Sequence, residues 1–107
     1  MDDYAEITPE DLRARLDAGT APALLDVREP WEHELATLPG ARLIPMDQLE
    51  GRVDEVEPGR EVVVYCHHGV RSAAVVGWLR HLGVPAVNLA GGIDAWASRV
   101  DPRLRRY

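Results

Sequence analysis

Short apolar runs alternate with segments of helical periodicity along most of the chain. The runs at residues 23–27, 42–44, 61–65 and 85–89 have the length and composition of strands. The run at 61–65 contains three consecutive valines. Unbroken β-branched runs are typical of parallel strands that are covered on both faces. We therefore expect this strand in the middle of a parallel sheet.

Helical patterns occupy most of the segments between these runs. Residues 8–19 predict a helix with Thr8 as its N-cap and Pro9 in its first position. Residues 70–82 predict a second helix, and the pair Gly91-Gly92 opens a last predicted helix that runs through Arg99. The apolar stripe predicted for the second helix comprises Val70, Ala73, Ala74, Gly77, Trp78 and Leu82.

The connections between these elements are short. Residues 28–34 predict a polar connection with room for one helical turn, and residues 46–56 predict a short helix with Asp47 as its cap. Strands and helices that alternate in this way are typical of an α/β fold, here a small parallel sheet of about five strands with helices on both faces. We expect residues 1–107 to form a single domain. Such sheets bind ligands at the carboxyl ends of their strands, where Cys66 is placed.

Composition and charge narrow the classes of function. The 107 residues carry a formal net charge of −6, which argues against nucleic-acid binding because that relies on clustered positive charge. A single cysteine excludes an internal disulfide and a zinc cluster built on cysteines. The first residues lack the apolar core of a signal peptide, and no apolar run approaches the roughly 18 residues of a membrane helix. We therefore expect a cytoplasmic protein that does not bind membranes.

Cys66 ends the strongest strand and begins a loop, CHHGVRS, that leads into a helix. Backbone N–H groups at a helix N-terminus lack carbonyl partners, and the helix dipole adds about half a positive charge there. Gly69 permits a backbone conformation that a Cβ would oppose, and Arg71 adds a permanent cation. The pattern predicts an anion cradle in which Cys66 is a thiolate nucleophile. The alternative is a buried cysteine that fills the core.

His67 and His68 follow the cysteine directly, and adjacent histidines are also found in metal sites. Side chains at consecutive positions are expected to point apart, and the sequence shows no fourth ligand. We therefore predict no metal here. We expect a solvent-facing loop whose imidazoles gain positive charge as the pH falls.

Four segments of the chain resemble motifs of one known family. They are LLDVREPWEHE, LPGARLIPM, CHHGVRS and LAGGIDAW, and they follow the family's order between residues 22 and 97. With these motifs the chain resembles the rhodanese family of sulfurtransferases, whose active-site loop has four residues between cysteine and arginine. The resemblance implies a rhodanese-like fold and an enzyme of the thiosulfate sulfurtransferase type.

The resemblance also implies a mechanism and a set of site residues. Cys66 would take a sulfane sulfur from a donor as a persulfide and pass it to a thiophilic acceptor, with Arg71 holding the charge. The loop residues that bind substrate or persulfide are His67, His68, Gly69, Val70 and Ser72. The supporting residues are Asp26, Arg28, Gly91 and Gly92. Asp26 and Arg28 are alternatively an ordinary buried salt-bridge pair, and no cofactor is implied.

The sulfur donor and acceptor stay open. The family often has Lys or Arg and then Ser or Thr where this chain has His67 and His68, which puts thiosulfate in doubt as the donor. Residues 96–107 are similar to the end of rhodanese domains fused to enzymes that activate sulfur-carrier proteins for molybdenum-cofactor synthesis or tRNA thiolation. Alternatively, they form a basic tail that packs back on the domain. The implied partners are a small-molecule donor and acceptor, and a sulfur-carrier protein, thioredoxin or cysteine desulfurase, with the chain a monomer or weak homodimer.

Two other functions fit parts of this pattern. Cysteine phosphatases and arsenate reductases also place a cysteine and an arginine around an anion. The phosphatases have five residues between the two, whereas four separate Cys66 from Arg71. The shorter loop suits one sulfur atom better than a tetrahedral phosphate. The second alternative is a sulfur carrier or partner-binding module with little turnover, although non-catalytic members of the family usually lack the cysteine.

Overall fold

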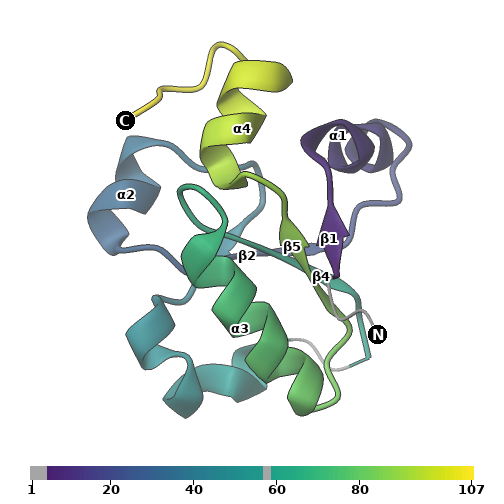
Figure 1. The fold of residues 1–107 in the computed structure, drawn as a ribbon, viewed down its shortest axis with the longest axis vertical. Helices are drawn as coiled ribbons and strands as arrows, with labels where there is room; N and C mark the ends of the chain where they lie inside the picture. Colours follow the sequence, from purple (N-terminus) through teal and green to yellow (C-terminus); the bar gives the residue numbers. More distant parts are fainter. Residues whose placement is uncertain (1–4, 57–58) are drawn as a thin grey trace.

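A five-stranded parallel sheet forms the centre of the protein, with the strand order β1-β5-β4-β2-β3. The computed structural model describes residues 5–56 and 59–107. The strands are β1 (Glu6–Ile7), β2 (Ala23–Asp26), β3 (Arg42–Leu43), β4 (Val62–Tyr65) and β5 (Ala86–Leu89). β4 lies in the middle, between β5 and β2 (Figure 1). The predicted parallel α/β architecture is therefore confirmed.

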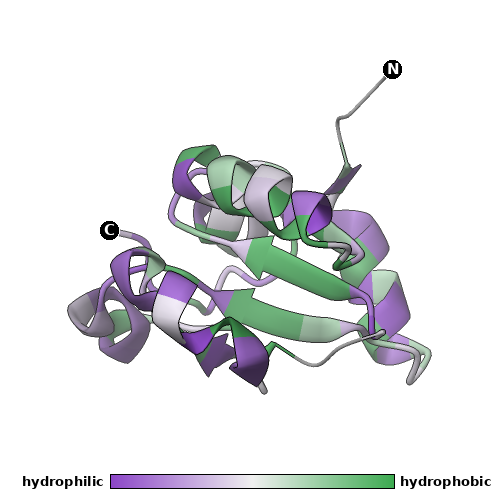
Figure 2. Cartoon of the chain, turned by 90° about the horizontal axis from the view of Figure 1, so that it is seen from below, coloured by the Kyte–Doolittle hydropathy of each residue, from purple (hydrophilic) through white to green (hydrophobic). Residues whose placement is uncertain are grey.

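Helices cover both faces of this sheet. α1 (Pro9–Asp17) and α4 (Gly92–Arg99) pack on one face, and α3 (Val70–His81) packs on the other. α2 (Pro30–Leu35) follows β2, and two short 3-10 helices, η1 (Met46–Gln48) and η2 (Glu50–Glu55), contribute to the layer of α3. Figure 2 shows central strands that are mostly green, the hydrophobic end of its scale, between helices that carry many purple, hydrophilic positions. Among the described residues, no helix has the length and hydropathy that crossing a membrane requires.

Alternate side chains of β4 build two separate hydrophobic cores. Val62 and Val64 belong to the core beneath α3, and Val63 and Tyr65 belong to the core beneath α1 and α4. All four are at most 3 % exposed. Residues that join the first core include Leu25, Val75, Val76 and Leu79, and those that join the second include Leu12, Leu24, Ile93 and Trp96. A strand buried on both faces is what its run of valines predicts.

The predicted strands and the three main helices are confirmed to within about two residues at each end. Thr8 caps α1, because its hydroxyl accepts a hydrogen bond from Asp11 N at 3.1 Å. β1 is not among the predicted strands, since two residues at a sheet edge leave no periodic signal. Residues 46–56 are helical as predicted, but they form two short 3-10 helices, η1 and η2, and the predicted cap is wrong because no side chain caps either of them.

The buried face of α3 differs from the predicted apolar stripe. Its buried residues are Ser72, Val75, Val76 and Leu79. Val70, placed on the predicted stripe, is instead 78 % exposed. Apolar side chains occur on every side of this helix, so hydrophobicity alone does not select a face. The short loop after β4 sets the rotation of the helix and turns Ser72 towards Cys66.

Candidate active site

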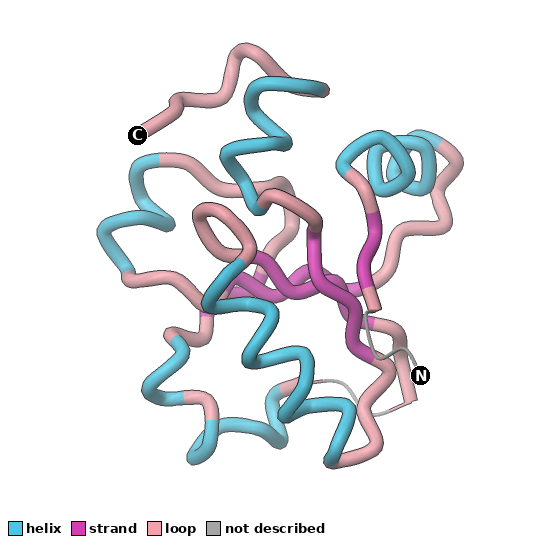
Figure 3. The backbone as a smooth tube through the Cα atoms, viewed as in Figure 1, coloured by secondary structure: helices cyan, strands magenta, loops and turns pink. Residues whose placement is uncertain are grey.

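The loop after β4 places Cys66 at the N-terminus of α3. Cys66 follows the strand directly and is 1 % exposed. The chain then curls once before α3 begins at Val70, as the tube in Figure 3 shows. Gly69 makes this curl with a φ of 97°, in the left-handed region that glycine adopts most readily. A Cβ on Gly69 would lie 3.4 Å from Gly91 N, so the two glycine turns are in close contact.

Three hydrogen bonds point at Cys66 Sγ. The backbone N–H groups of Gly69 and Ser72 donate from 3.2 and 3.3 Å, and the Ser72 hydroxyl lies 3.3 Å away. These two amides lie at the start of α3, where no intrahelical carbonyl is available to them. Because the amide dipoles and the helix dipole all direct positive charge at the sulfur, this position stabilises a negatively charged sulfur atom.

The N-terminus of α4 donates hydrogen bonds to carbonyl groups of the same loop. Ile93 N donates to the carbonyl oxygen of Cys66 at 2.9 Å, and Asp94 N donates to that of His67 at 3.0 Å. A Cβ on Gly92 would lie 2.4 Å from the His67 oxygen and 2.6 Å from the Cys66 oxygen. The absence of a side chain at Gly92 is therefore what lets α4 approach the loop so closely.

Arg71, in the first turn of α3, forms a bidentate ion pair with Glu32 of α2. Its two terminal nitrogens donate to the two carboxylate oxygens at 2.8 and 2.9 Å. These hydrogen bonds lower the pKa of Glu32 to about 2 and raise that of Arg71 above its ordinary value. The guanidinium is therefore bound to the carboxylate. Within the described residues, no hydrogen bond joins it to Cys66 Sγ.

Asp26 and Arg28 form a fully buried ion pair at the end of β2. The guanidinium Nε and Nη2 donate to the two Asp26 oxygens at 2.8 and 2.7 Å, and both side chains are 0 % exposed. His33 Nδ1 lies 2.8 Å from Asp26, and Arg28 also donates to the carbonyl oxygen of Ala36 at 2.6 Å. These contacts join β2 to α2 and do not reach the sulfur. The geometry therefore favours the buried salt-bridge interpretation of the pair.

Tyr107 joins this network from the far end of the sequence. Its hydroxyl accepts a hydrogen bond from Arg28 and donates one to Glu32, both at 2.7 Å. Its ring stacks on His67, with centroids 3.8 Å apart and planes 6° apart, and meets Trp31 edge-on. The segment after α4 thus returns towards α2, as Figure 1 shows. The tail packs back on the rest of the chain, which is one of the two alternatives that the sequence left open.

Asn88 of β5 ties two parts of the loop together. Its Nδ2 donates to the carbonyl oxygen of Gly69 at 3.1 Å, and its Oδ1 accepts from the Ser72 hydroxyl at 2.6 Å. The Ser72 hydroxyl has one hydrogen, so it donates either to Asn88 or to the sulfur at any moment. Asn88 is 5 % exposed, and its bonds hold the loop in the conformation that aims its amides at Cys66.

Three residues of this site are absent from those predicted by sequence: Glu32, Asn88 and Tyr107. An amide inside the apolar run AVNL is a signal that marks Asn88. Glu32 has the spacing of a capping box, and Glu29 N donates to its Oε1 at 2.9 Å. Tyr107 has no local signal, because its hydrogen bond to Glu32 spans 75 residues.

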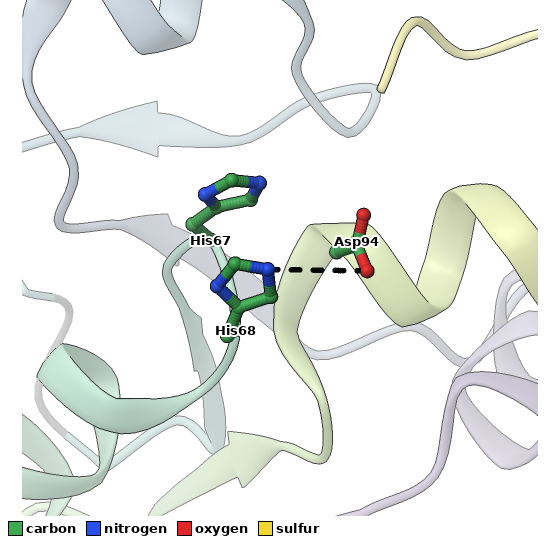
Figure 4. Close-up of side chains that lie close together, drawn as sticks. All are labelled: His67, His68 and Asp94. Atoms are coloured by element: carbon green, nitrogen blue, oxygen red, sulfur yellow. Dashed lines mark ion pairs between the residues drawn. The ribbon is translucent and has the colours of Figure 1, made fainter. Parts of the chain in front are cut away.

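His67 and His68 stack on each other, so the expectation that their side chains point apart is wrong. Their ring centroids are 3.9 Å apart, with 27° between the ring planes. His68 Nε2 lies 4.0 Å from Asp94 Oδ2, the contact that is dashed in Figure 4. Burial and the adjacent His68 lower the pKa of His67, which disfavours its cationic form. His68 is exposed to solvent as expected, whereas His67 is partly buried.

A metal ion fits this cluster poorly, although ligand atoms of His67, His68 and Asp94 lie within 4.8 Å of one another. Imidazole nitrogens bind metals along lone pairs in the ring plane, and two nearly parallel rings do not direct these at one point. His67 Nε2 is buried without a hydrogen-bond partner among the described residues, but Tyr107 covers the same ring. Asp94 already accepts two hydrogen bonds from Arg106, at 3.0 and 3.1 Å. We assign no ion to these side chains.

Comparison with known proteins shows the family of this chain. The rhodanese-like domain model matches residues 8–99. A sulfurtransferase from Allochromatium vinosum is 39% identical over 93 residues, which cover 86% of this chain and 87% of that protein. The probable adenylyltransferase/sulfurtransferase MoeZ of Mycobacterium tuberculosis is 41% identical over 105 residues, which cover 94% of this chain and 26% of MoeZ. A rhodanese-like domain protein from Staphylococcus aureus has a TM-score of 0.84 at 33% identity, covering 96% of this chain and 98% of that one.

The chain therefore belongs to the rhodanese-like domain family. Its five-stranded parallel sheet with flanking helices is the rhodanese-like fold of the Staphylococcus aureus protein. Two of its relatives are named sulfurtransferases. The chain spans about a quarter of the length of MoeZ, with 26% of that protein matched.

Proposed function

We propose that the protein is a sulfurtransferase that carries a sulfane sulfur as a persulfide on Cys66. The observation that supports this most directly is the pair of N–H groups, from Gly69 and Ser72, that donate to Cys66 Sγ. Such a site favours the anionic sulfur of a thiolate and that of a persulfide. The relatives named sulfurtransferases support the same chemistry.

In the proposed reaction, the Cys66 thiolate attacks the outer sulfur of the donor. A bond forms between the two sulfur atoms, and the donor's own bond to its outer sulfur breaks. The electron pair of the broken bond leaves with the rest of the donor, which is sulfite when the donor is thiosulfate. A thiolate or cyanide then attacks the outer sulfur of the persulfide, and Cys66 leaves as a thiolate.

The other loop residues support this reaction without contacting the transferred atom directly. We assign Arg71 a positioning role, because its guanidinium is bound to Glu32. Val70, which is 78 % exposed at the start of α3, offers an apolar contact to an approaching donor or acceptor. Gly69 and Asn88 keep the loop closed around the sulfur through the hydrogen bond between them.

The physiological partners are proposed from the chemistry and the relatives together. The name of MoeZ joins an adenylyltransferase to a sulfurtransferase, and this chain matches 26% of it. On this basis we propose a protein-borne acceptor, a sulfur-carrier protein, with a cysteine desulfurase or thioredoxin as further partners. A reducing compartment such as the cytoplasm suits a reaction that depends on a free thiolate.

The test compares two reactions of the same protein sample. The protein is incubated with thiosulfate and cyanide, and separately with an aryl phosphate, and thiocyanate and phosphate are measured. We expect thiocyanate from the wild type, none from Cys66→Ala, and no phosphate from either. Phosphate release without thiocyanate formation would overturn the proposal in favour of a phosphatase. A persulfide that forms without turnover would favour the sulfur-carrier alternative.

A further inference from the structure

The arginines around the active-site loop are each bound to a carboxylate. The three pairs are Arg71–Glu32, Arg28–Asp26 and Arg106–Asp94. The pKa of His67 is lowered by burial, so this ring adds little positive charge at neutral pH. The positive potential at Cys66 therefore comes mainly from backbone N–H groups, and the side chains contribute little net charge. The sequence predicts that Arg71 adds a permanent cation to the loop amides, whereas in the structure Glu32 offsets that cation.

Glu32 is the carboxylate that offsets the arginine of the loop itself. Its Oε1 accepts from Arg71 and from Glu29 N, at 2.8 and 2.9 Å. Its Oε2 accepts from Arg71 and from Tyr107, at 2.9 and 2.7 Å. The side chain is 4% exposed, and its pKa is lowered to about 2, chiefly by the hydrogen bonds from Arg71. Glu32 is therefore an ionised group in a fixed position at neutral pH.

Tyr107 holds Glu32 in this position. Arg28 donates to the Tyr107 hydroxyl at 2.7 Å, so the hydroxyl hydrogen is free to point at Glu32. Burial, and then the hydrogen bond to Glu32, raise the pKa of Tyr107 to about 12, so the phenol keeps this hydrogen in ordinary buffers. Stacking on His67 keeps the ring in place. The hydroxyl thus acts on the loop through Glu32 and is a positioning group.

We propose, building on the persulfide chemistry proposed above, that Glu32 held by Tyr107 determines donor specificity by disfavouring dianionic donors relative to monoanionic ones. A lone guanidinium attracts a dianion twice as strongly as a monoanion, and a carboxylate repels it twice as strongly. In the Arg71–Glu32 pair these two effects largely cancel. Removing the charge of Glu32 therefore helps a dianion more than it helps a monoanion.

Thiosulfate and methanethiosulfonate are a matched pair of probes for this charge effect. Each carries a transferable outer sulfur, but the first is a dianion and the second a monoanion. Attack by the Cys66 thiolate breaks the bond to that sulfur and releases sulfite in one case and methanesulfinate in the other. Both leave the same persulfide, so charge is conserved in each reaction. The quantity measured is the ratio of kcat/KM for thiosulfate to kcat/KM for methanethiosulfonate, with cyanide as the acceptor.

Two variants separate the charge of Glu32 from its packing. We expect Glu32→Gln to raise this ratio by about three- to fivefold at low ionic strength, and about 0.5 M salt to reduce the change. Tyr107→Phe keeps the stacked ring and removes the hydroxyl, and we expect it to raise the ratio by about twofold. Glu10→Gln is the control, because Glu10 also forms a bidentate pair, with Arg99, on an exposed surface at the other end of α4. This control changes the net charge equally and is expected to leave the ratio unchanged.

The outcomes separate this inference from the proposed function. If the wild type forms no persulfide with either donor, the proposed function itself is overturned. If the wild type forms the persulfide but Glu32→Gln leaves the ratio unchanged or lowers it, the specificity proposal is overturned. An equal rise of the ratio in Glu10→Gln also overturns the specificity proposal, since the rise would then reflect the net charge of the protein alone. Circular dichroism establishes whether each variant is folded. If Glu32→Gln is not folded, the ratio in Tyr107→Phe takes its place, and no rise in that ratio overturns the specificity proposal.

Discussion

The N-termini of α3 and α4 lie next to each other and both follow a glycine in the left-handed region, Gly69 with a φ of 97° and Gly91 with a φ of 75°. The amides at the start of α3 point at Cys66 Sγ, whereas those of Ile93 and Asp94 in α4 donate to backbone carbonyl groups. One helix end thus keeps its positive potential for the reacting atom. The other uses its hydrogen bonds to fix the loop that carries that atom.

This difference shows that a helix N-terminus is not by itself a site. Both ends have the same dipole and the same unpartnered N–H groups before the loop is placed. In α4 the backbone carbonyl groups of Cys66 and His67 satisfy these groups. In α3 the strand delivers a side chain, the Cys66 thiol, to the point where the amides converge. The two helix N-termini therefore differ in the group that lies against their N–H groups, which is a thiol at α3 and backbone carbonyl groups at α4.

The largest effect is expected from Gly92→Ala, which pushes α4 away from the loop. The new Cβ would lie 2.4 Å from the His67 carbonyl oxygen, at a φ of 67°. Backbone strain and overpacking together should lower the free energy of unfolding by about 3 kcal/mol. The measurement is urea denaturation of the wild type and the variant.

The matched control for this effect is Gly40→Ala. Gly40 has a φ of 78°, but nothing lies within 4 Å of the position of its Cβ. Its substitution should therefore show the strain alone, about 1 kcal/mol. Equal losses in the two variants would contradict the role of Gly92 as the contact between α4 and the loop.

A smaller effect is expected from Asn88→Ala, which removes the hydrogen bonds that hold the active-site loop at the start of α3. The substitution leaves the Gly69 carbonyl group and the Ser72 hydroxyl without their present partners in a buried position. We expect a loss of about 2 kcal/mol in the free energy of unfolding. Slower thiocyanate formation from thiosulfate should accompany it, because the loop amides are no longer held in place.

The control for Asn88→Ala is Ser98→Ala, which removes an exposed hydrogen bond to Ala95 in α4. We expect it to change the free energy of unfolding by less than about 0.5 kcal/mol and to leave the rate unchanged. A wild-type rate in Asn88→Ala would show that the Gly69 turn keeps its conformation without the amide.

The effect of acid tests the link between α3 and α2. The pKa of Glu32 is lowered from 4.5 to about 2, chiefly by Arg71, so the folded state favours the carboxylate. The stability that this ionisation contributes is present above pH 4.5 and is lost as the pH falls towards 2. Glu32→Gln removes the contribution, so the difference in stability between wild type and variant should shrink over that window. A constant difference from pH 6 to pH 2, measured by thermal unfolding, would contradict the ionised pair.

Much of the fold is predictable because its signals are local. Thr8 and Pro9 begin α1 as their capping preferences indicate, and the valines of β4 predict a strand with two buried faces. The face of α3 is not predictable in this way, because Val70 and Val75 are equally apolar and only the loop geometry decides between them. β1 is missed since its two residues pair with β5, far along the chain.

The residues of the candidate site also divide into those with a local sequence signal and those placed by contacts between distant parts of the chain. Cys66, Gly69 and Arg71 follow from the order of strand, loop and helix. The sequence could not indicate that Arg71 is bound to Glu32, or that Tyr107 holds Glu32, because these contacts join residues 39 and 75 positions apart. The network of charges around the sulfur is therefore a property of the folded chain.

The assignment of Cys66 as the sulfur carrier is tested most directly by the intact mass of the protein after exposure to thiosulfate and, separately, to methanethiosulfonate. We expect the wild type to gain the mass of one sulfur atom and to lose it again on addition of cyanide. We expect Ser72→Ala, which keeps the thiol, the loop amides and Arg71, to gain the sulfur as well, and Cys66→Ala not to gain it. Addition of sulfur to Cys66→Ala, or no addition to the wild type with either donor, would contradict the assignment of Cys66 as the sulfur carrier.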